Sequence, residues 1–79
     1  MYIPIQLLEE SDQGALWAFH VEDVGWYRFT VDRRSGRGQL EDADLARERG
    51  LDGHFFRAVD RVQDQWLRGR EVLRTCYAG

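Results

Sequence analysis

The sequence contains few residues that fix structure by covalent cross-links or by backbone restraint. Cys76 is the only cysteine and Pro4 the only proline. A single cysteine excludes a disulfide within the chain and leaves no cysteine pair with the spacing of a zinc site. This usage fits a reducing compartment, so we expect a cytoplasmic protein.

Long apolar runs and an excess of positive charge are also missing. No apolar run approaches the roughly 18 residues of a membrane-spanning helix, and the opening MYIPIQLLEE lacks the basic and apolar regions of a signal peptide. Fourteen acidic residues outnumber 11 basic ones, which gives a net charge of −3. The overall charge therefore argues against nucleic acid as a partner, and we expect neither export nor a membrane span.

Lysine is absent, so every basic residue is an arginine. Guanidinium groups suit paired recognition of carboxylate or phosphate. Codon usage in a GC-rich genome explains the same bias more simply, and it points to a bacterial source.

Apolar and aromatic residues, in contrast, are plentiful. They include three Trp, four Phe and three Tyr, and apolar residues make up 43% of the chain. This content is too high for a disordered tail. At 79 residues the chain, 1–79, forms a single domain, and a domain near this size buries only about 60% of its unfolded surface, so oligomerisation would add useful burial.

Alternation of apolar and polar residues predicts an antiparallel meander of three or four strands, at 2–9, 15–22, 26–32 and, for a short fourth strand, 39–41. Pro4 has no backbone N–H, so the first strand should lie at a sheet edge or begin close to that residue. One face of the meander is strongly apolar, with Ile3, Ile5, Leu7, Trp17, Phe19, Val21, Tyr27, Phe29 and Val31.

Two helices should follow the strands. Asp42 can cap a short helix that ends at Arg49, with Gly50 in the left-handed region. Asp52 can cap a second, long helix, with Leu51 and Phe56 as a hydrophobic staple. Spacings of four and three give this helix one apolar stripe, made of Phe55, Val59, Val62, Trp66, Gly69, Leu73 and Cys76.

The end of the long helix is ambiguous, because residues 72–77 also alternate as a strand does. We favour a continuous helix because Gly69 falls on the stripe, where a missing side chain permits close approach of another backbone. The predicted fold class is therefore α+β, with the long C-terminal helix packed on one face of the sheet.

A helix that continued through Tyr77 would be longer than the strands beneath it, and its far end would need cover. We therefore predict a homodimer whose interface comprises Trp66, Gly69, Leu73, Cys76 and Tyr77.

The second face of the sheet carries an isolated large aromatic residue. Trp26 shares this face with His20 and Arg28, and a tryptophan flanked by arginine is typical of a protein-binding surface. The simpler alternative is that Trp26 lies beneath the short helix or the N-terminal strand.

Arg33, Arg34 and Arg37 surround two glycines, Gly36 and Gly38, in the turn after the third strand. This turn is a candidate anion-binding site, although it lacks the spacing of the common nucleotide-binding fingerprints. Together with the sheet aromatics it supports the alternative of an RNA-binding or single-stranded-DNA-binding protein.

Residues for catalysis are not grouped in the sequence. His20, His54 and Cys76 lie far apart, so we predict no metal site, no cofactor and no catalytic residues. The sequence favours a small non-catalytic bacterial module that binds another protein and acts as a homodimer.

Overall fold

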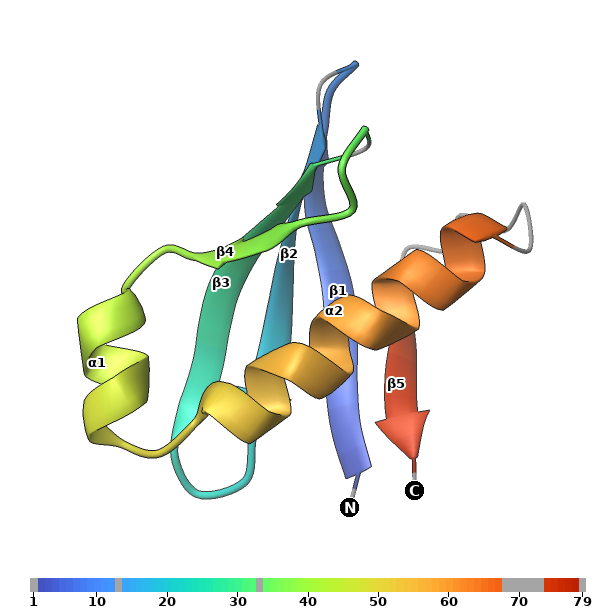
Figure 1. Ribbon diagram of the computed structural model, residues 1–79. Helices are drawn as coiled ribbons and strands as arrows, with labels where there is room; N and C mark the ends of the chain where they lie inside the picture. Colours follow the sequence, from blue (N-terminus) through green and yellow to red (C-terminus); the bar gives the residue numbers. More distant parts are fainter. Residues whose placement is uncertain (1, 13, 33, 68–73, 79) are drawn as a thin grey trace.

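A computed structural model describes residues 2–12, 14–32, 34–67 and 74–78. The fold is α+β, as predicted from the sequence. In chain order the elements are β1 (Tyr2–Glu10), β2 (Gly14–Val21), β3 (Gly25–Asp32), β4 (Gly38–Leu40), α1 (Ala43–Glu48), α2 (Asp52–Leu67) and β5 (Arg74–Ala78), as shown in Figure 1.

All five strands form one antiparallel sheet in the order β4-β3-β2-β1-β5. The first four strands make the predicted meander, and their bounds agree with the prediction to within one residue at each end. The β2–β3 ladder is unbroken from Gly14↔Asp32 to Val21↔Gly25. The β1–β2 ladder contains one register shift, between Leu7 and Glu9.

The prediction of one helix through Tyr77 is wrong. In the described residues α2 ends at Leu67, and Cys76 and Tyr77 belong to β5. This strand returns to the start of the chain, where Arg74–Ala78 pair with Tyr2–Gln6. The free edge of β1 thus supplies the hydrogen-bond partners for the backbone of Arg74–Ala78 that a longer helix would otherwise have supplied.

Pro4 does not lie at a sheet edge, because β1 is flanked by β2 and β5. The prediction of an edge strand is therefore wrong. The ladder between β1 and β2 begins at Ile5, one residue after the proline. The other half of the expectation is confirmed, because β1 begins at Tyr2, two residues before Pro4.

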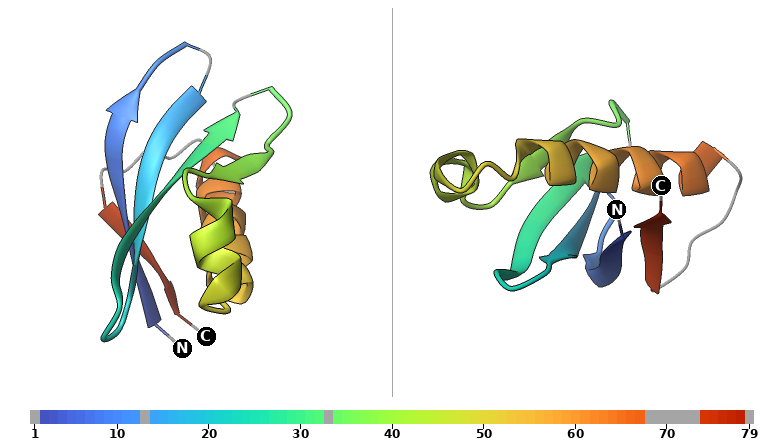
Figure 2. Two further views of the ribbon diagram at one scale, coloured as in Figure 1. Left: turned by 90° about the vertical axis from the view of Figure 1, so that its left-hand side faces the viewer. Right: turned by 90° about the horizontal axis from the view of Figure 1, so that it is seen from below.

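Both helices lie on the same side of the sheet (Figure 2). The inner face beneath them holds the core, in which Ile3, Ile5, Trp17, Phe19, Phe29 and Val31 are each no more than 1% exposed. From α2 the residues Ala58, Val59 and Val62 are buried against this face, and Phe55 and Trp66 pack against the same cluster while half-buried. The apolar stripe therefore faces the sheet up to Trp66, as predicted.

The connection between the helices follows the predicted capping in part. The Asp42 carboxylate accepts a hydrogen bond from the Leu45 N–H at 3.0 Å, and Gly50 has a φ of 69°. The hydrophobic staple is wrong, because Leu51 is buried whereas Phe56 is 67% exposed. Phe55 takes the inward position instead and meets Phe29 edge to face at 6.0 Å.

Arg61 fastens β5 to α2. Its Nε donates to Thr75 Oγ1 at 3.2 Å, and one terminal nitrogen forms an ion pair with Asp64, also at 3.2 Å. Through Thr75, Arg61 contacts β5, the strand that was not predicted from the sequence.

Gly38 of β4 packs directly against α2. A Cβ at this position would overlap Val59 Cγ2 and lie 3.2 Å from Phe55 Cζ. We expect Gly38→Ala to lower the free energy of unfolding by about 1–3 kcal/mol, because the packed helix has no room to yield. Urea denaturation would measure the change.

Gly53→Ala is the matched control. Its new Cβ would meet only the flexible end of Arg57, at 2.9 Å, within the first turn of α2. Alanine favours the helix, so this variant should gain roughly 0.5 kcal/mol. Equal destabilisation of the two variants would contradict the close packing of β4 on α2.

Gln65 is the one buried polar residue among those described, at 4% exposure, and its Oε1 has no hydrogen-bond partner within the described chain. Methionine fills a similar volume without an unpaired carbonyl. We expect Gln65→Met to raise the free energy of unfolding by about 1 kcal/mol, measured by urea denaturation. Gln65→Glu would bury a charge and should lower it; loss of stability in both variants would contradict the unpaired carbonyl.

Candidate functional site

The two faces of the sheet differ sharply in exposure. The face beneath the helices is buried, whereas the opposite face has no helix over it in the described part of the chain (Figure 2). We name this opposite surface the open face. The strand registers assign to it Tyr2, Pro4, Gln6, Glu9, Leu16, Ala18, His20, Trp26, Arg28, Thr30, Asp32, Gln39, Arg74, Cys76 and Ala78.

Trp26 and His20 form the aromatic centre of the open face. They are directly paired across β2 and β3, and their ring centroids lie 5.1 Å apart at an interplanar angle of 58°. Trp26 remains 51% exposed. The indole ring of Trp26 therefore contacts the His20 ring and remains about half exposed to solvent.

The short helix does not cover Trp26. Its C-cap residue, Arg49, donates instead to the hydroxyl of Tyr27 at 2.5 Å, and Tyr27 lies on the inner face with Phe19. The alternative that Trp26 lies beneath α1 is therefore wrong. Successive residues of a strand point to opposite faces of the sheet, so Tyr27 points towards the helices and Trp26 points to the open face.

Arg28 lies on the same strand face as Trp26 and is paired with an acid of its own chain. Its Nε lies 2.7 Å from Glu41 Oε2, with both side chains about half exposed. The Glu41 N–H also donates to the Arg28 carbonyl at 3.0 Å. Such a surface pair contributes little to stability, but it balances the charge beside Trp26.

The structure thus brings together Trp26, His20 and Arg28, the three residues predicted to bind a partner. Sequence reasoning missed Tyr2, which lies on the open face of β1 and is 67% exposed. The signal was present, because Ile3 and Ile5 point to the core and alternation places Tyr2 and Pro4 on the other side.

The residues predicted for a helical dimer interface are dispersed. Trp66 packs against the core from α2, Cys76 is half-buried in β5, and Tyr77 lies in the same strand. Gly69 and Leu73 lie outside the described residues. The 16 residues of α2 span about 24 Å and end at Leu67, so the continuous helix through Tyr77 that motivated this interface is not present in the described chain.

The turn after β3 uses its backbone donors internally. Asp32 Oδ1 accepts from the N–H groups of Arg34 and Ser35 at 2.7 and 3.1 Å, and Ser35 Oγ accepts from the Arg37 N–H at 3.2 Å. The hydrogen bonds from the Ser35 and Arg34 N–H groups hold the pKa of the Asp32 carboxyl below its ordinary value. A carboxylate of the chain therefore occupies the amides that an external anion would need, and Arg33 lies outside the described residues.

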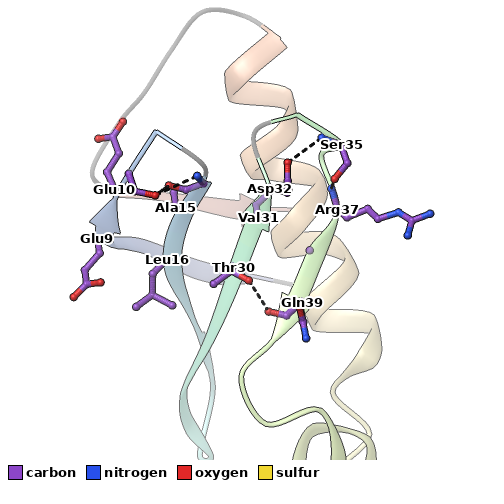
Figure 3. Close-up of a pocket in the computed structure, with 13 residues that line it drawn as sticks. Glu9, Glu10, Ala15, Leu16, Thr30, Val31, Asp32, Ser35, Arg37 and Gln39 are labelled. Atoms are coloured by element: carbon purple, nitrogen blue, oxygen red, sulfur yellow. Dashed lines mark hydrogen bonds between the residues drawn. The ribbon is translucent and has the colours of Figure 1, made fainter.

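A shallow depression of about 800 Å³ lies between this turn and the turn that joins β1 to β2. Glu9 and Glu10 line one side of it, while the Arg37 side chain extends away from them (Figure 3). The mixed charges do not favour an anion. Trp26 lies at the opposite end of β3, so the arginine turn and the aromatic pair do not form one continuous site.

Within the described ranges, no group of three or more His, Cys, Asp or Glu side chains is arranged to hold a metal ion. His20 lies on the open face, His54 in the first turns of α2, and Cys76 in β5. None of the described helices combines the length and the apolar character needed to cross a membrane.

The lowered pKa of Asp32 predicts a pH-dependent contribution to stability. The ionised carboxylate is favoured in the folded state, so its contribution is present above the ordinary aspartate pKa of 3.8 and is lost as the pH falls through the lower folded-state value. We expect the stability difference between wild type and Asp32→Ala to shrink in acid, as measured by urea denaturation across this range.

Asp32→Asn is the control, because its amide oxygen can still accept from Arg34 and Ser35 but does not titrate. Its stability relative to Asp32→Ala should not change over the same pH range. A carboxyl of Asp32 that titrates at or above 3.8 in an NMR experiment would contradict the lowered pKa.

The open face carries the candidate functional residues, with Trp26 and His20 at one end of β2 and β3 and the Arg28–Glu41 pair beside them. No protein-family model matches the chain, and searches of curated proteins and of solved structures gave no match.

Proposed function

We propose that the protein is a non-catalytic module that binds another protein through its open face, with Trp26 as the anchor. The observation that carries this proposal is the half-exposed indole of Trp26 on a sheet face that no described helix covers. Tryptophan is enriched among the residues that dominate binding energy at interfaces.

The surroundings of Trp26 support this role. His20 packs beside the indole and limits its freedom, so little conformational entropy is lost when a partner covers the ring. The remaining exposed half of the indole would be buried on binding. Apolar burial of this kind contributes roughly 25 cal/mol per Å² before the costs of association.

The chemistry of the partner follows from the same residues. Arg28 is neutralised by Glu41, so the centre of the open face has no strong net charge. We infer a partner with an apolar pocket for the indole and a polar rim that meets Arg28, Thr30 and Gln39. A five-stranded sheet is about 24 Å wide, which allows a small interface and favours reversible binding.

We further propose that the module acts in the bacterial cytoplasm. The single, half-buried cysteine and the use of arginine alone as the basic residue support this assignment.

Nucleic acid is the less favoured partner. The arginine turn and Trp26 lie at opposite ends of β3, and Asp32 already occupies the backbone donors of that turn. Binding of single-stranded RNA by this chain would need a basic track beside the aromatic residues. The acidic residues Glu9, Glu10 and Glu41 lie near the sheet face instead.

Affinity capture from the native cell, with wild type and Trp26→Ala compared, tests the proposal. We expect a specific partner to be retained by wild type and lost by Trp26→Ala, because truncation of such an anchor typically costs 2 kcal/mol or more, roughly a 30-fold loss of affinity. Phe56→Ala is the control, since Phe56 is also an exposed aromatic residue, at 67%, but lies on α2. It should retain the partner.

Thermal unfolding of each variant shows whether the fold is preserved. Identical captured proteins for wild type and Trp26→Ala would exclude the open face as the binding surface. A salt-dependent shift of single-stranded RNA that requires Arg34 and Arg37 would favour the nucleic-acid alternative instead.

A further inference from the structure

The edge of the sheet at β5 is a second surface with unused binding capacity. Among the described strands, β5 pairs only with β1, and it ends the sheet on that side. Its outer row of backbone N–H and C=O groups therefore has no strand beside it in the described chain. Another extended strand is the ligand that satisfies such a row most completely.

The two edge strands of the sheet are not equally protected. β4 has three residues, and the acidic Glu41 follows it directly. β5 has five residues in an unbroken register with β1, and it contains no proline, no lysine and no bulge. Short length, charge, proline and bulges are the features that prevent strands from pairing at an edge. Of these, β5 has one charged residue, Arg74 at its first position, and its paired length is greater than that of β4.

We propose that a second copy of this chain pairs with β5 in antiparallel fashion, about a two-fold axis that passes through Cys76. Because Cys76 is the middle residue of Arg74–Ala78, this register pairs the whole strand with itself. Arg74 then lies opposite the partner's Ala78, and Thr75 lies opposite the partner's Tyr77.

The chemistry of the strand is self-complementary in this register. No like charges face each other, because the only charged residue of β5 lies opposite an alanine. The sheets of the two copies join into one, and the contact is isologous, as a closed two-fold dimer requires.

The edge is held ready for this contact. Arg61 of α2 donates to Thr75, and α2 crosses over β5 (Figure 1). In an antiparallel pair, the first residue of one strand lies opposite the last residue of the other. The two α2 helices therefore lie on the same side of the joined sheet, and their C-terminal ends lie apart from each other. A strand already fixed in this way loses little entropy on pairing.

This dimer differs from the one expected from a long helix, although it also uses Cys76 and Tyr77. It is independent of the open-face proposal, because Trp26 on β3 is separated from β5 by β2 and β1. Trp26→Ala should therefore leave self-association unchanged.

Light scattering across a concentration series tests the proposal first. We expect the mass to rise from the 9.3 kDa of one chain towards twice that value as concentration increases. A mass that stays at one chain up to about 1 mM, where even a weak contact would be occupied, overturns the proposal.

A charge exchange at the two-fold axis tests the position of the contact. Cys76→Glu and Cys76→Arg should each weaken self-association at least tenfold, because two like charges would lie opposite each other. Mixing the two variants should restore association as a heterodimer, to within about threefold of wild type. Association of each single variant at wild-type strength would show that copies meet elsewhere, and would overturn the β5 contact.

Cross-linking provides a readout that does not depend on these variants. Wild type contains one thiol, so a short bis-maleimide links two copies only through Cys76. The control moves the thiol to the exposed turn between β2 and β3, as Glu22→Cys with Cys76→Ser. We expect efficient linkage in wild type and little in the control; equal linkage would contradict the proposed axis.

Discussion

One helix lies across one face of the sheet, and this single layer determines which residues are buried. The stripe of α2 fills the inner face with Val59 and Val62 against Phe29 and its neighbours. A helix about 10 Å wide can cover only a few strands and one side of them. The same constraint that completes the core therefore leaves the other face, with Trp26 and His20, uncovered in the described chain.

Local patterns in the sequence were sufficient for every element whose partner is close in the chain. Alternation placed β2 and β3, and the side chain of Asp42 and the φ of Gly50 matched the expected helix ends. β5 was missed because residues 72–77 fit both periodicities and because its partner, Tyr2–Gln6, lies at the other end of the chain. No local signal reports a pairing of such long range.

The candidate site was likewise predicted from the sequence only in part. Alternation alone predicts that Trp26, His20 and Arg28 share a face, and the register confirms it. The exposure of Trp26 depends on the position of α1, which no local sequence pattern predicted. In the structure Arg49 donates to Tyr27, the next residue of β3, which points to the opposite face of the sheet from Trp26. The ion pair of Arg28 with Glu41 was likewise invisible, because it requires the position of β4 relative to β3.

The pairing of Tyr2 with Ala78 places the two described ends of the chain side by side (Figure 1). β1 is synthesised before β5, so its edge on the β5 side stays unpaired until the residues through Ala78 have emerged. Closing so long a loop makes this ladder a late and slow step of folding. Until then the nascent chain presents β1 as a temporary edge, where a chaperone or a neighbouring nascent chain can attach first.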